Sequence, residues 1–330
     1  SLVRYGMIVI NKTKNLGLKT LYEKVGLPRN GSPIDARQLA FQIIPLINAA
    51  GRMQHANIAY DLLTTEDDEE ATKLAYQLID ANVERQRITE EIYKEAKVQL
   101  QDKHDRKILV AYADHWLTTV GGIVASRLTH EYNKPTLIIG KRNGQWAGSS
   151  RSIPNFHIAE ALQRVEEHLE TYGGHAGAAG FTVKEKDPSS FIVAIEKEGE
   201  HAFEDKKLVP ELRIDAVIGL DDVTEDLLDW LEKFKPFGEA NKKPLFLITD
   251  CITTYSQALG KNGDHMKVIV AKPNGSGSLK FIFFNGTKRF GEKLGEGVCF
   301  DAVVELDYNI WRGIAEIQMK VVDMKIKGSK

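Results

Sequence analysis

The sequence predicts an α/β domain that follows a long connector helix and precedes an all-β barrel. From Lys107 to about residue 205, apolar strand-like runs alternate with amphipathic helical runs. Beyond about residue 210, short apolar strands separated by turn signals follow one another. A chain of 330 residues is long enough for two or three such domains, since domains cluster around roughly 100–150 residues.

The chain begins with helical segments. Residues 1–33 contain an amphipathic stretch, LGLKTLYEKVGL, that ends near Pro28 and the Asn30-Gly31 turn signal. A helical connector is expected over residues 34–105, and its first helix is a short one around Ala36 to Ile44.

The connector continues as one long helix that starts after Thr65 and runs to about Gln101. Its first turn carries the acids EDDEE, which the helix macrodipole favours at an N-terminus. This explanation is preferred to a metal site for the acidic run. Apolar residues then recur at helical spacing: Leu74, Leu78, Ile88, Ile92 and Ala96.

The α/β domain is expected over residues 106–207. Its predicted strands are KILVAYA, KPTLIIG, GQWAGSSRSI and GFTV, and its predicted helices are VGGIVASRLTHEY, HIAEALQRVEEHLE and SSFIVAIEKEGEHAF. A short charged link near Asp205 to Pro210 marks the boundary.

The barrel is expected over residues 208–330. A helix around Glu225 to Phe234 precedes five strands, PLFLITD, DHMKVIVAK, SLKFIFFN, GVCFDAVVEL and GIAEIQMKVVDMKI. The loop NGSGS at 274–278 fits a hairpin. Among small barrels of this kind, the OB-fold is the commonest one with a nucleic-acid-binding face.

Composition excludes several classes of protein. No apolar run approaches the roughly 20 residues of a membrane span, so no membrane partner is expected. Cys251 and Cys299 lack a second cysteine or histidine at zinc-ligand spacing, which favours a reduced, cytoplasmic setting. With a formal net charge of −2, a polyanion would have to bind a local basic face.

One histidine stands in an unusual setting, GGHAGAAG at 173–180. Gly173 and Gly174 permit a close backbone approach to a ligand, and His175 is the only side chain there with acid–base chemistry. The structural alternative is a helix that ends at Gly173, followed by a packed strand that holds a hydrogen-bonded histidine.

Three further motifs carry candidate phosphate ligands. GSSRS at 148–152 places hydroxyls beside Arg151, whose planar fork of donors matches a phosphate. In PLINAAGRM, Arg52 either reaches a phosphate or pairs with an acid across the connector. In VGGIVASRL, the glycine pair either exposes backbone N–H groups to an anion or allows close strand-to-helix packing, and Arg127 has no assigned role.

In combination these motifs are more specific than any of them alone. NAAGRM, GIVASRL, GSSRSIP and GGHAGAAG, with SLVRYGMIVIN, NVERQ, PFGEANKKPLF and DYNIW, resemble the RecJ family of single-stranded-DNA-specific exonucleases within the DHH phosphoesterases. The resemblance covers essentially the whole chain. It implies that residues 1–33 are the tail of a catalytic DHH domain, 106–207 a DHH-associated domain and 208–330 an OB-fold.

The resemblance also implies roles for individual residues. His175 would face a metal centre and contact the scissile phosphate, next to Gly173 and Gly174. Arg52, Ser149 and Arg151 would grip the 5′-terminal phosphate. Members of the family remove nucleotides from a 5′ end, which implies a function in DNA repair and recombination.

The sequence departs from the family pattern at several points. The Asp-His-His motif and its accompanying aspartates do not occur in the 330 residues, so the catalytic DHH domain is absent from them. Two divalent ions, Mn²⁺ or Mg²⁺, are implied for the whole enzyme, no metal ligand is assigned to this chain, and the chain alone is expected to be inactive. Leu46 replaces an arginine, Leu117 a histidine and Thr119 a glycine of the family pattern.

The barrel offers basic and aromatic candidates for contact with a single strand. In KFIFF, alternation puts Phe281 and Phe283 on one face and Ile282 and Phe284 on the other, and one pair is expected in the core. The DNA-binding candidates are Lys267, Lys280, Phe281, Phe283, Tyr308, Trp311 and Arg312.

Three functions are compared. The first is the substrate-binding part of a RecJ-like 5′-to-3′ exonuclease on single-stranded DNA, with the catalytic DHH domain and a single-strand-binding protein as partners. The second is a DHH phosphodiesterase for short oligonucleotides or cyclic dinucleotides, for which the large C-terminal barrel has no use. The third is a single-strand-binding module without enzymatic activity.

Overall fold

The computed structural model describes residues 2–28, 33–103, 105–204, 209–311 and 314–327. By contacts between Cα atoms the chain divides into two compact units, residues 6–210 and residues 211–330, with the first five residues grouped with the second. The expected boundary at 207/208 lies outside the described residues.

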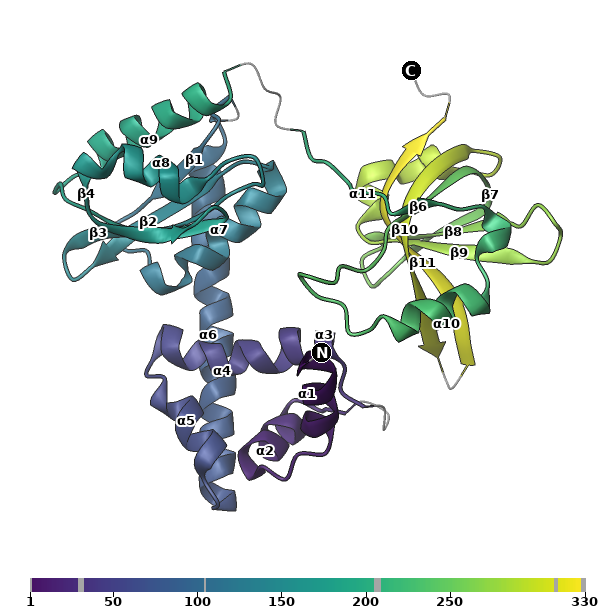
Figure 1. Cartoon of the computed structure of the whole chain (residues 1–330), viewed down its shortest axis with the longest axis horizontal. Helices are drawn as coiled ribbons and strands as arrows, with labels where there is room; N and C mark the ends of the chain where they lie inside the picture. The colour runs from purple at the N-terminus through teal and green to yellow at the C-terminus, as the bar shows by residue number, and fades with distance from the viewer. Residues whose placement is uncertain (1, 29–32, 104, 205–208, 312–313, 328–330) are drawn as a thin grey trace. The chain divides into compact units, whose positions relative to one another are not determined.

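The first unit begins with helices gathered around one long helix (Figure 1). Helices α2, α4 and α5 pack on the N-terminal half of α6, around a core that includes Leu21, Leu62 and Leu78. The short helix expected around Ala36 to Ile44 continues through a π-helical turn as far as Met53. The helices are α1 (Leu2–Asn11), α2 (Leu16–Lys24), α3 (Ala36–Gln38), the π-turn Leu39–Ile43, α4 (Ile44–Met53), α5 (Asn57–Thr64) and α6 (Asp68–Leu100).

The acidic start of α6 is a helix cap. The side chain of Asp67 accepts a hydrogen bond from the Glu70 N–H at 2.7 Å, and three acids occupy the first turn. Thr65 lies outside the helix and donates its hydroxyl proton to Glu70 Oε2 at 2.5 Å. The predicted helix is thus confirmed, with Asp67 as its N-cap.

The α/β part is a five-stranded sheet with the order β1-β2-β3-β5-β4. Helices α8 and α9 cover one face, and α7 with the C-terminal half of α6 covers part of the other (Figure 1). The elements are β1 (Leu109–Tyr112), α7 (Thr118–Tyr132), β2 (Thr136–Arg142), β3 (Gln145–Arg151), α8 (Ile158–Arg164), the 3₁₀ turn Glu166–His168, β4 (Leu169–His175), β5 (Ala178–Val183) and α9 (Ser189–Ala202).

One predicted helix of this domain is too long. HIAEALQRVEEHLE is helical only as far as Arg164, and Leu169 already begins β4. Gly173 therefore lies inside a strand, so the alternative in which it ends a helix is wrong. The physical reason is that Leu169 is buried against the sheet core, where strand pairing with Val183 satisfies its backbone.

Polar and cation–π contacts fix α6 to the sheet. The amide of Gln99 donates to the Tyr112 carbonyl at 2.9 Å and accepts from the Tyr112 N–H at 3.0 Å, which satisfies backbone groups on the edge strand β1. Trp116 Nε1 donates to Glu95 at 2.7 Å. Arg127 lies 3.5 Å from the Tyr93 ring centroid and pairs with Glu90, so its role is structural.

The second unit contains a closed five-stranded barrel, β10-β11-β9-β8-β7, in which β10 pairs back with β7 and β11 runs parallel to β9. The predicted barrel is confirmed. Its core includes Phe281, Phe283 and Phe300. The elements are β6 (Ala216–Val217), the 3₁₀ turn Leu220–Asp222, α10 (Glu225–Lys233), β7 (Phe246–Leu259), β8 (His265–Ala271), β9 (Ser278–Phe283), α11 (Gly286–Phe290), the 3₁₀ turn Gly291–Leu294, β10 (Cys299–Trp311) and β11 (Ile314–Ile326).

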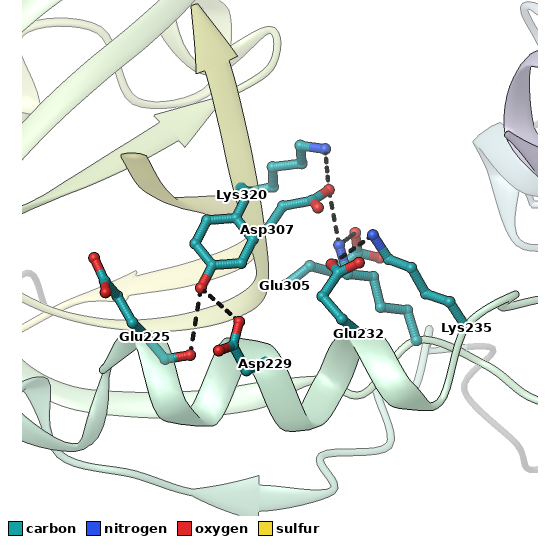
Figure 2. Close-up of polar contacts among 9 residues, drawn as sticks. Glu225, Asp229, Glu232, Lys235, Glu305, Asp307 and Lys320 are labelled. Atoms are coloured by element: carbon teal, nitrogen blue, oxygen red, sulfur yellow. Dashed lines mark hydrogen bonds and ion pairs between the residues drawn. The ribbon is translucent and has the colours of Figure 1, made fainter. Parts of the chain in front are cut away.

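Helix α10 is attached to the barrel wall by a polar network, shown in Figure 2. The Tyr308 hydroxyl donates to the Glu225 carbonyl at 3.3 Å and to Asp229 at 3.2 Å. Asp307 pairs with Lys320 at 2.6 Å and with Lys243 at 2.9 Å. Burial alone would raise the pKa of Asp307, but the hydrogen bonds from these two lysines hold that pKa below its usual value.

Among the described residues, no helix is both long enough and apolar enough to cross a bilayer.

Candidate functional site

The sheet of the first unit has one half-open face. Helix α7 packs over β2 and β3 but leaves β5 and β4 uncovered on that face. Strand pairing aligns Ser149 with Gly180 and Gly173, and aligns Arg151 with Ala178 and His175. Residues two apart on a strand point to the same side, so Ser149, Arg151 and His175 share this face. The predicted motifs GSSRS and GGHAGAAG therefore meet on one surface.

The two glycines before the histidine have different reasons to be glycine. A Cβ at Gly174 would lie 2.3 Å from the Ala178 carbonyl oxygen, so packing within the hairpin requires glycine there. A Cβ at Gly173 would meet nothing within 4 Å, and Gly173 is exposed. No intramolecular contact in the described residues excludes a side chain at Gly173, whereas a ligand that approaches the strand backbone would exclude one.

His175 is exposed and oriented by its own hairpin. Its Nδ1 accepts a hydrogen bond from the Gly177 N–H at 3.2 Å. In the neutral ring the proton is therefore on Nε2, which leaves an N–H donor that points away from the hairpin. The arrangement suits donation to an oxygen of a bound anion.

Arg151 projects from the end of β3 toward α7. Its Nη1 donates to the Ser150 carbonyl at 2.8 Å. A Cβ at Gly122 would lie 3.0 Å from Arg151 Nη2, so this glycine makes room for the guanidinium against the helix. A Cβ at Gly121 would lie 3.5 Å from Ile138 Cγ2, an ordinary van der Waals contact, so packing against β2 does not by itself require glycine there and both explanations for the glycine pair stay open.

Arg52, at the end of α4, reaches the start of α7. Its Nη1 donates to the Thr119 carbonyl at 2.8 Å, and the Thr119 hydroxyl donates to the Arg52 carbonyl at 2.8 Å. Thr119 thus uses the hydroxyl that a glycine at this position would lack. Leu46, the other departure on α4, is buried in the helical core, where a charged guanidinium would be costly.

Arg85 on α6 completes the cluster, although sequence reasoning assigned it no role beyond its place in NVERQ. Its half-buried guanidinium is held by Asn82. Burial, and then repulsion from Arg52, lower the pKa values of both Arg85 and Arg151. Arg52 and Arg151 both lie against the start of α7, at Thr119 and at Gly122, and Arg52 acts electrostatically on both Arg85 and Arg151.

None of these three arginines forms an ion pair with an acid among the described residues, and each donates instead to a carbonyl or an amide. Unneutralised, partly buried guanidiniums are the chemistry that recognises phosphate. Ser149, half-buried beside them, adds a hydroxyl donor. The role of the third arginine was missed because NVERQ, although it was noted as a motif, does not show which residues from other elements Arg85 meets.

The same surface does not fit a metal ion. Across the described ranges, no three histidine, cysteine, aspartate or glutamate side chains are grouped so as to hold one. The candidate site is a set of hydrogen-bond donors, whereas divalent cations require acceptor ligands. No catalytic step through a metal can be placed on these residues.

The residues of the barrel that were predicted to bind DNA differ in their surroundings. Phe281 is 0% exposed and Phe283 3% exposed, so their prediction as base-stacking residues is wrong: closure of the barrel turns this pair inward. Lys280 forms an ion pair with Glu316, and the Tyr308 hydroxyl is bound to α10. The Trp311 side chain and Arg312 lie outside what the structure describes.

An exposed aromatic residue that the prediction missed lies on the outer wall of the barrel. Tyr255 on β7 is 51% exposed, and Lys267 Nζ lies 5.9 Å from its ring centroid. A basic side chain beside an accessible ring is the combination that stacks bases and holds a backbone. Tyr255 had no sequence signal, because it lies in the continuation of β7 beyond the predicted strand PLFLITD.

Family models match two parts of the chain. The DHHA1 domain matches residues 105–198, and the RecJ OB domain matches residues 214–323.

Relatives match across most of the chain. The single-stranded-DNA-specific exonuclease RecJ of Bacillus subtilis is 30% identical over 327 residues, which are 97% of this chain and 41% of the relative. The protein of the same name from Thermus thermophilus is 32% identical over 248 residues, 75% of this chain and 35% of the relative. The chain thus spans less than half the length of either relative.

A solved structure also matches this chain over nearly its whole length. The crystal structure of RecJ in complex with Mn²⁺ from Thermus thermophilus matches 98% of this chain and 46% of its own, at 28% identity and a TM-score of 0.83.

Proposed function

We propose that this chain is the strand-binding part of a 5′-to-3′ exonuclease, because it belongs to the RecJ family. The enzyme would hydrolyse single-stranded DNA in repair and recombination. The observation that carries the proposal is the cluster of Arg52, Arg85 and Arg151, which has no acid partner among the described residues.

The cluster would bind the 5′-terminal phosphate. A terminal monoester has an extra oxygen and up to one more negative charge than an internal diester, and the forked donors of arginine read that difference. Ser149 would add a hydroxyl donor from the neighbouring row of the sheet. Recognition of this end would give the enzyme its direction along the strand.

The glycine hairpin would hold the next part of the strand. Neighbouring strands lie about 4.8 Å apart, so the backbone at His175, two strands from Arg151, is displaced from it by roughly 10 Å. With its Nε2 proton, His175 would donate to the scissile phosphate, and Gly173 would let the backbone approach. The glycines and alanines at 173–180 would leave space for the nucleotides to pass His175.

Hydrolysis would need residues outside these 330. We expect two divalent ions, Mn²⁺ or Mg²⁺, in a catalytic DHH domain that faces the hairpin and supplies the metal-activated water. The chain alone would then be inactive.

The barrel would hold the strand farther from its end. Lys267 and Tyr255 are the described residues best placed for this. The setting would be the cytoplasm, with a single-strand-binding protein as a further partner of the whole enzyme.

A binding experiment on the 330-residue chain tests the proposal. Fluorescence anisotropy would compare 5′-phosphorylated and 5′-hydroxyl single strands and a duplex over a range of salt. We expect micromolar or weaker affinity, a preference for the phosphorylated single strand, and affinity that falls as salt rises. Equal affinity for all three nucleic acids, or no dependence on salt, would contradict it.

A nuclease assay completes the test. With Mn²⁺ or Mg²⁺ added, the purified chain should release no mononucleotides. Robust metal-dependent release would show that the catalytic residues lie within these 330 residues.

A further inference from the structure

The side chain that holds Arg85 is a neutral amide. Asn82 lies one helical turn earlier on α6, is 9% exposed, and accepts from both Arg85 Nε at 3.1 Å and Arg85 Nη2 at 2.9 Å through its single Oδ1. Two hydrogen bonds from one edge of the guanidinium fix its plane. The other Nη2 proton and the two Nη1 protons are left for another acceptor.

The same helix offers a matched comparison two residues later. Arg87 is also held by the residue three positions before it, with Nε 2.8 Å and Nη2 2.6 Å from the carboxylate of Glu84. It is also bonded to Glu91. The two arginines therefore have the same spacing and the same pair of donors, but Arg87 has two carboxylates and Arg85 has an amide.

This difference changes what each guanidinium can do. The pKa of Arg87 is raised, first by the hydrogen bonds that it donates to Glu84, which stabilise its charged form. The pKa of Arg85 is lowered, first by burial and then by Arg52. A guanidinium already neutralised by carboxylates gains little from a phosphate, whereas one held by an amide keeps its full charge.

We propose that Asn82 is a positioning residue, which orients the Arg85 guanidinium without neutralising it and so keeps a third cation available to the terminal phosphate. The proposal rests on the proposed phosphate site. An aspartate at position 82 would have nearly the same shape and would hold Arg85 more firmly. It would also neutralise the guanidinium charge and repel the phosphate.

The test is Asn82→Asp in the 330-residue chain, because this change separates position from charge. Thermal unfolding should show a folded protein with an unchanged or higher Tm. The ratio of affinities for 5′-phosphorylated and 5′-hydroxyl single strands should fall at least fivefold. A role confined to stability would leave that ratio unchanged.

Two further variants serve as controls. Glu84→Gln makes the reverse exchange, from an acid to an amide, at the exposed Arg87 and should leave the ratio within twofold of wild type. Arg85→Ala should also lower the ratio, and in the Arg85→Ala background the neutral change Asn82→Ala should have no further effect on it.

The outcomes distinguish this inference from the proposed function. If Arg151→Ala lowers the ratio but Asn82→Asp does not, the role of Asn82 is wrong and the phosphate site stands. If the wild-type chain shows no preference at all, both fall. If Asn82→Asp does not fold, Asn82→Ala takes its place in the test. Asn82→Ala should then lower the affinity ratio only when Arg85 is present. If it lowers the ratio in the Arg85→Ala background as well, Asn82 does not act through Arg85 and the proposal is wrong.

Discussion

The arginine cluster of the first unit and the charged surface of the barrel use cations in opposite ways. Arg52, Arg85 and Arg151 donate to carbonyls and an amide. On the barrel, ion pairs with aspartate or glutamate occupy Lys243, Lys280, Arg289, Lys320 and Lys327. A cation that already has an acid partner must give it up to bind DNA. Whether a cationic side chain already has an acid partner, more than its charge alone, therefore distinguishes a DNA-binding residue from a structural one.

The two regions also differ in what their aromatic residues do. The barrel phenylalanines fill its core, while the open sheet face carries glycines and alanines. We therefore expect changes in the barrel to act mainly through stability, and changes in the arginine cluster to act mainly through binding.

The largest expected effect is on the stability of the barrel. Phe281→Ala removes a fully buried ring that packs on Phe300 at 5.6 Å between centroids, and should lower the free energy of unfolding by about 3–5 kcal/mol. Chemical denaturation would measure it. A variant with wild-type stability and weakened DNA binding would return Phe281 to the role of a stacking residue.

The next effect follows from giving the arginine cluster an acid. Ser149→Asp places a carboxylate on the sheet face that carries Arg151, so it should neutralise a guanidinium and repel a phosphate. We expect at least a tenfold loss of affinity for 5′-phosphorylated strands, measured by anisotropy. Ser149→Ala is the control and should lose less than threefold. Equal losses would mean that only the hydroxyl matters.

The barrel should lose stability in acid through a partly buried aspartate. The folded-state pKa of Asp307 is lowered, so its contribution is present above the unfolded pKa and is lost as pH falls through the folded pKa. Stability of the barrel should therefore decline below about pH 4, near the unperturbed aspartate pKa. Asp307→Asn should flatten this part of the pH profile. A steep acid loss that survives the substitution would assign it to other carboxylates.

The smallest effect comes from removing an acid on the barrel. Glu316→Gln frees Lys280 from its partner and should raise the affinity for single strands by about twofold, because an exposed ion pair contributes only about 0–1 kcal/mol. Titration of a 5′-hydroxyl strand would detect it. A fall in affinity would mean that Glu316 itself supports binding.

The fold was predictable from the sequence to a large extent, and the site only in part. Apolar periodicity predicts α6, α7 and the barrel strands, because burial on one face dictates that pattern. It does not predict that Leu169 starts a strand, since a short charged run fits a helix until pairing with Val183 satisfies its backbone.

The roles of the other residues were not predictable for the same physical reason: they depend on contacts between distant parts of the chain. Alternation showed that Phe281 and Phe283 share a face, but only barrel closure decides which face is inside. Arg85 became a site residue because α4 packs on α6 and brings Arg52 near it, a contact between positions far apart in sequence. The motifs at Arg151 and His175 were found because their chemistry is local.

On the function proposed here, arginines without an acid partner read the terminal phosphate. The most direct measurement is the ratio of affinities of the 330-residue chain for 5′-phosphorylated and 5′-hydroxyl single strands in wild type, Arg151→Ala and Arg151→Lys. Arg151→Ala should bring the ratio to about one while binding to the 5′-hydroxyl strand stays nearly intact. Arg151→Lys should restore little of the ratio, because a point charge lacks the forked geometry. If both variants keep the wild-type ratio, Arg151 is a structural residue and the arginine cluster does not recognise the 5′-terminal phosphate.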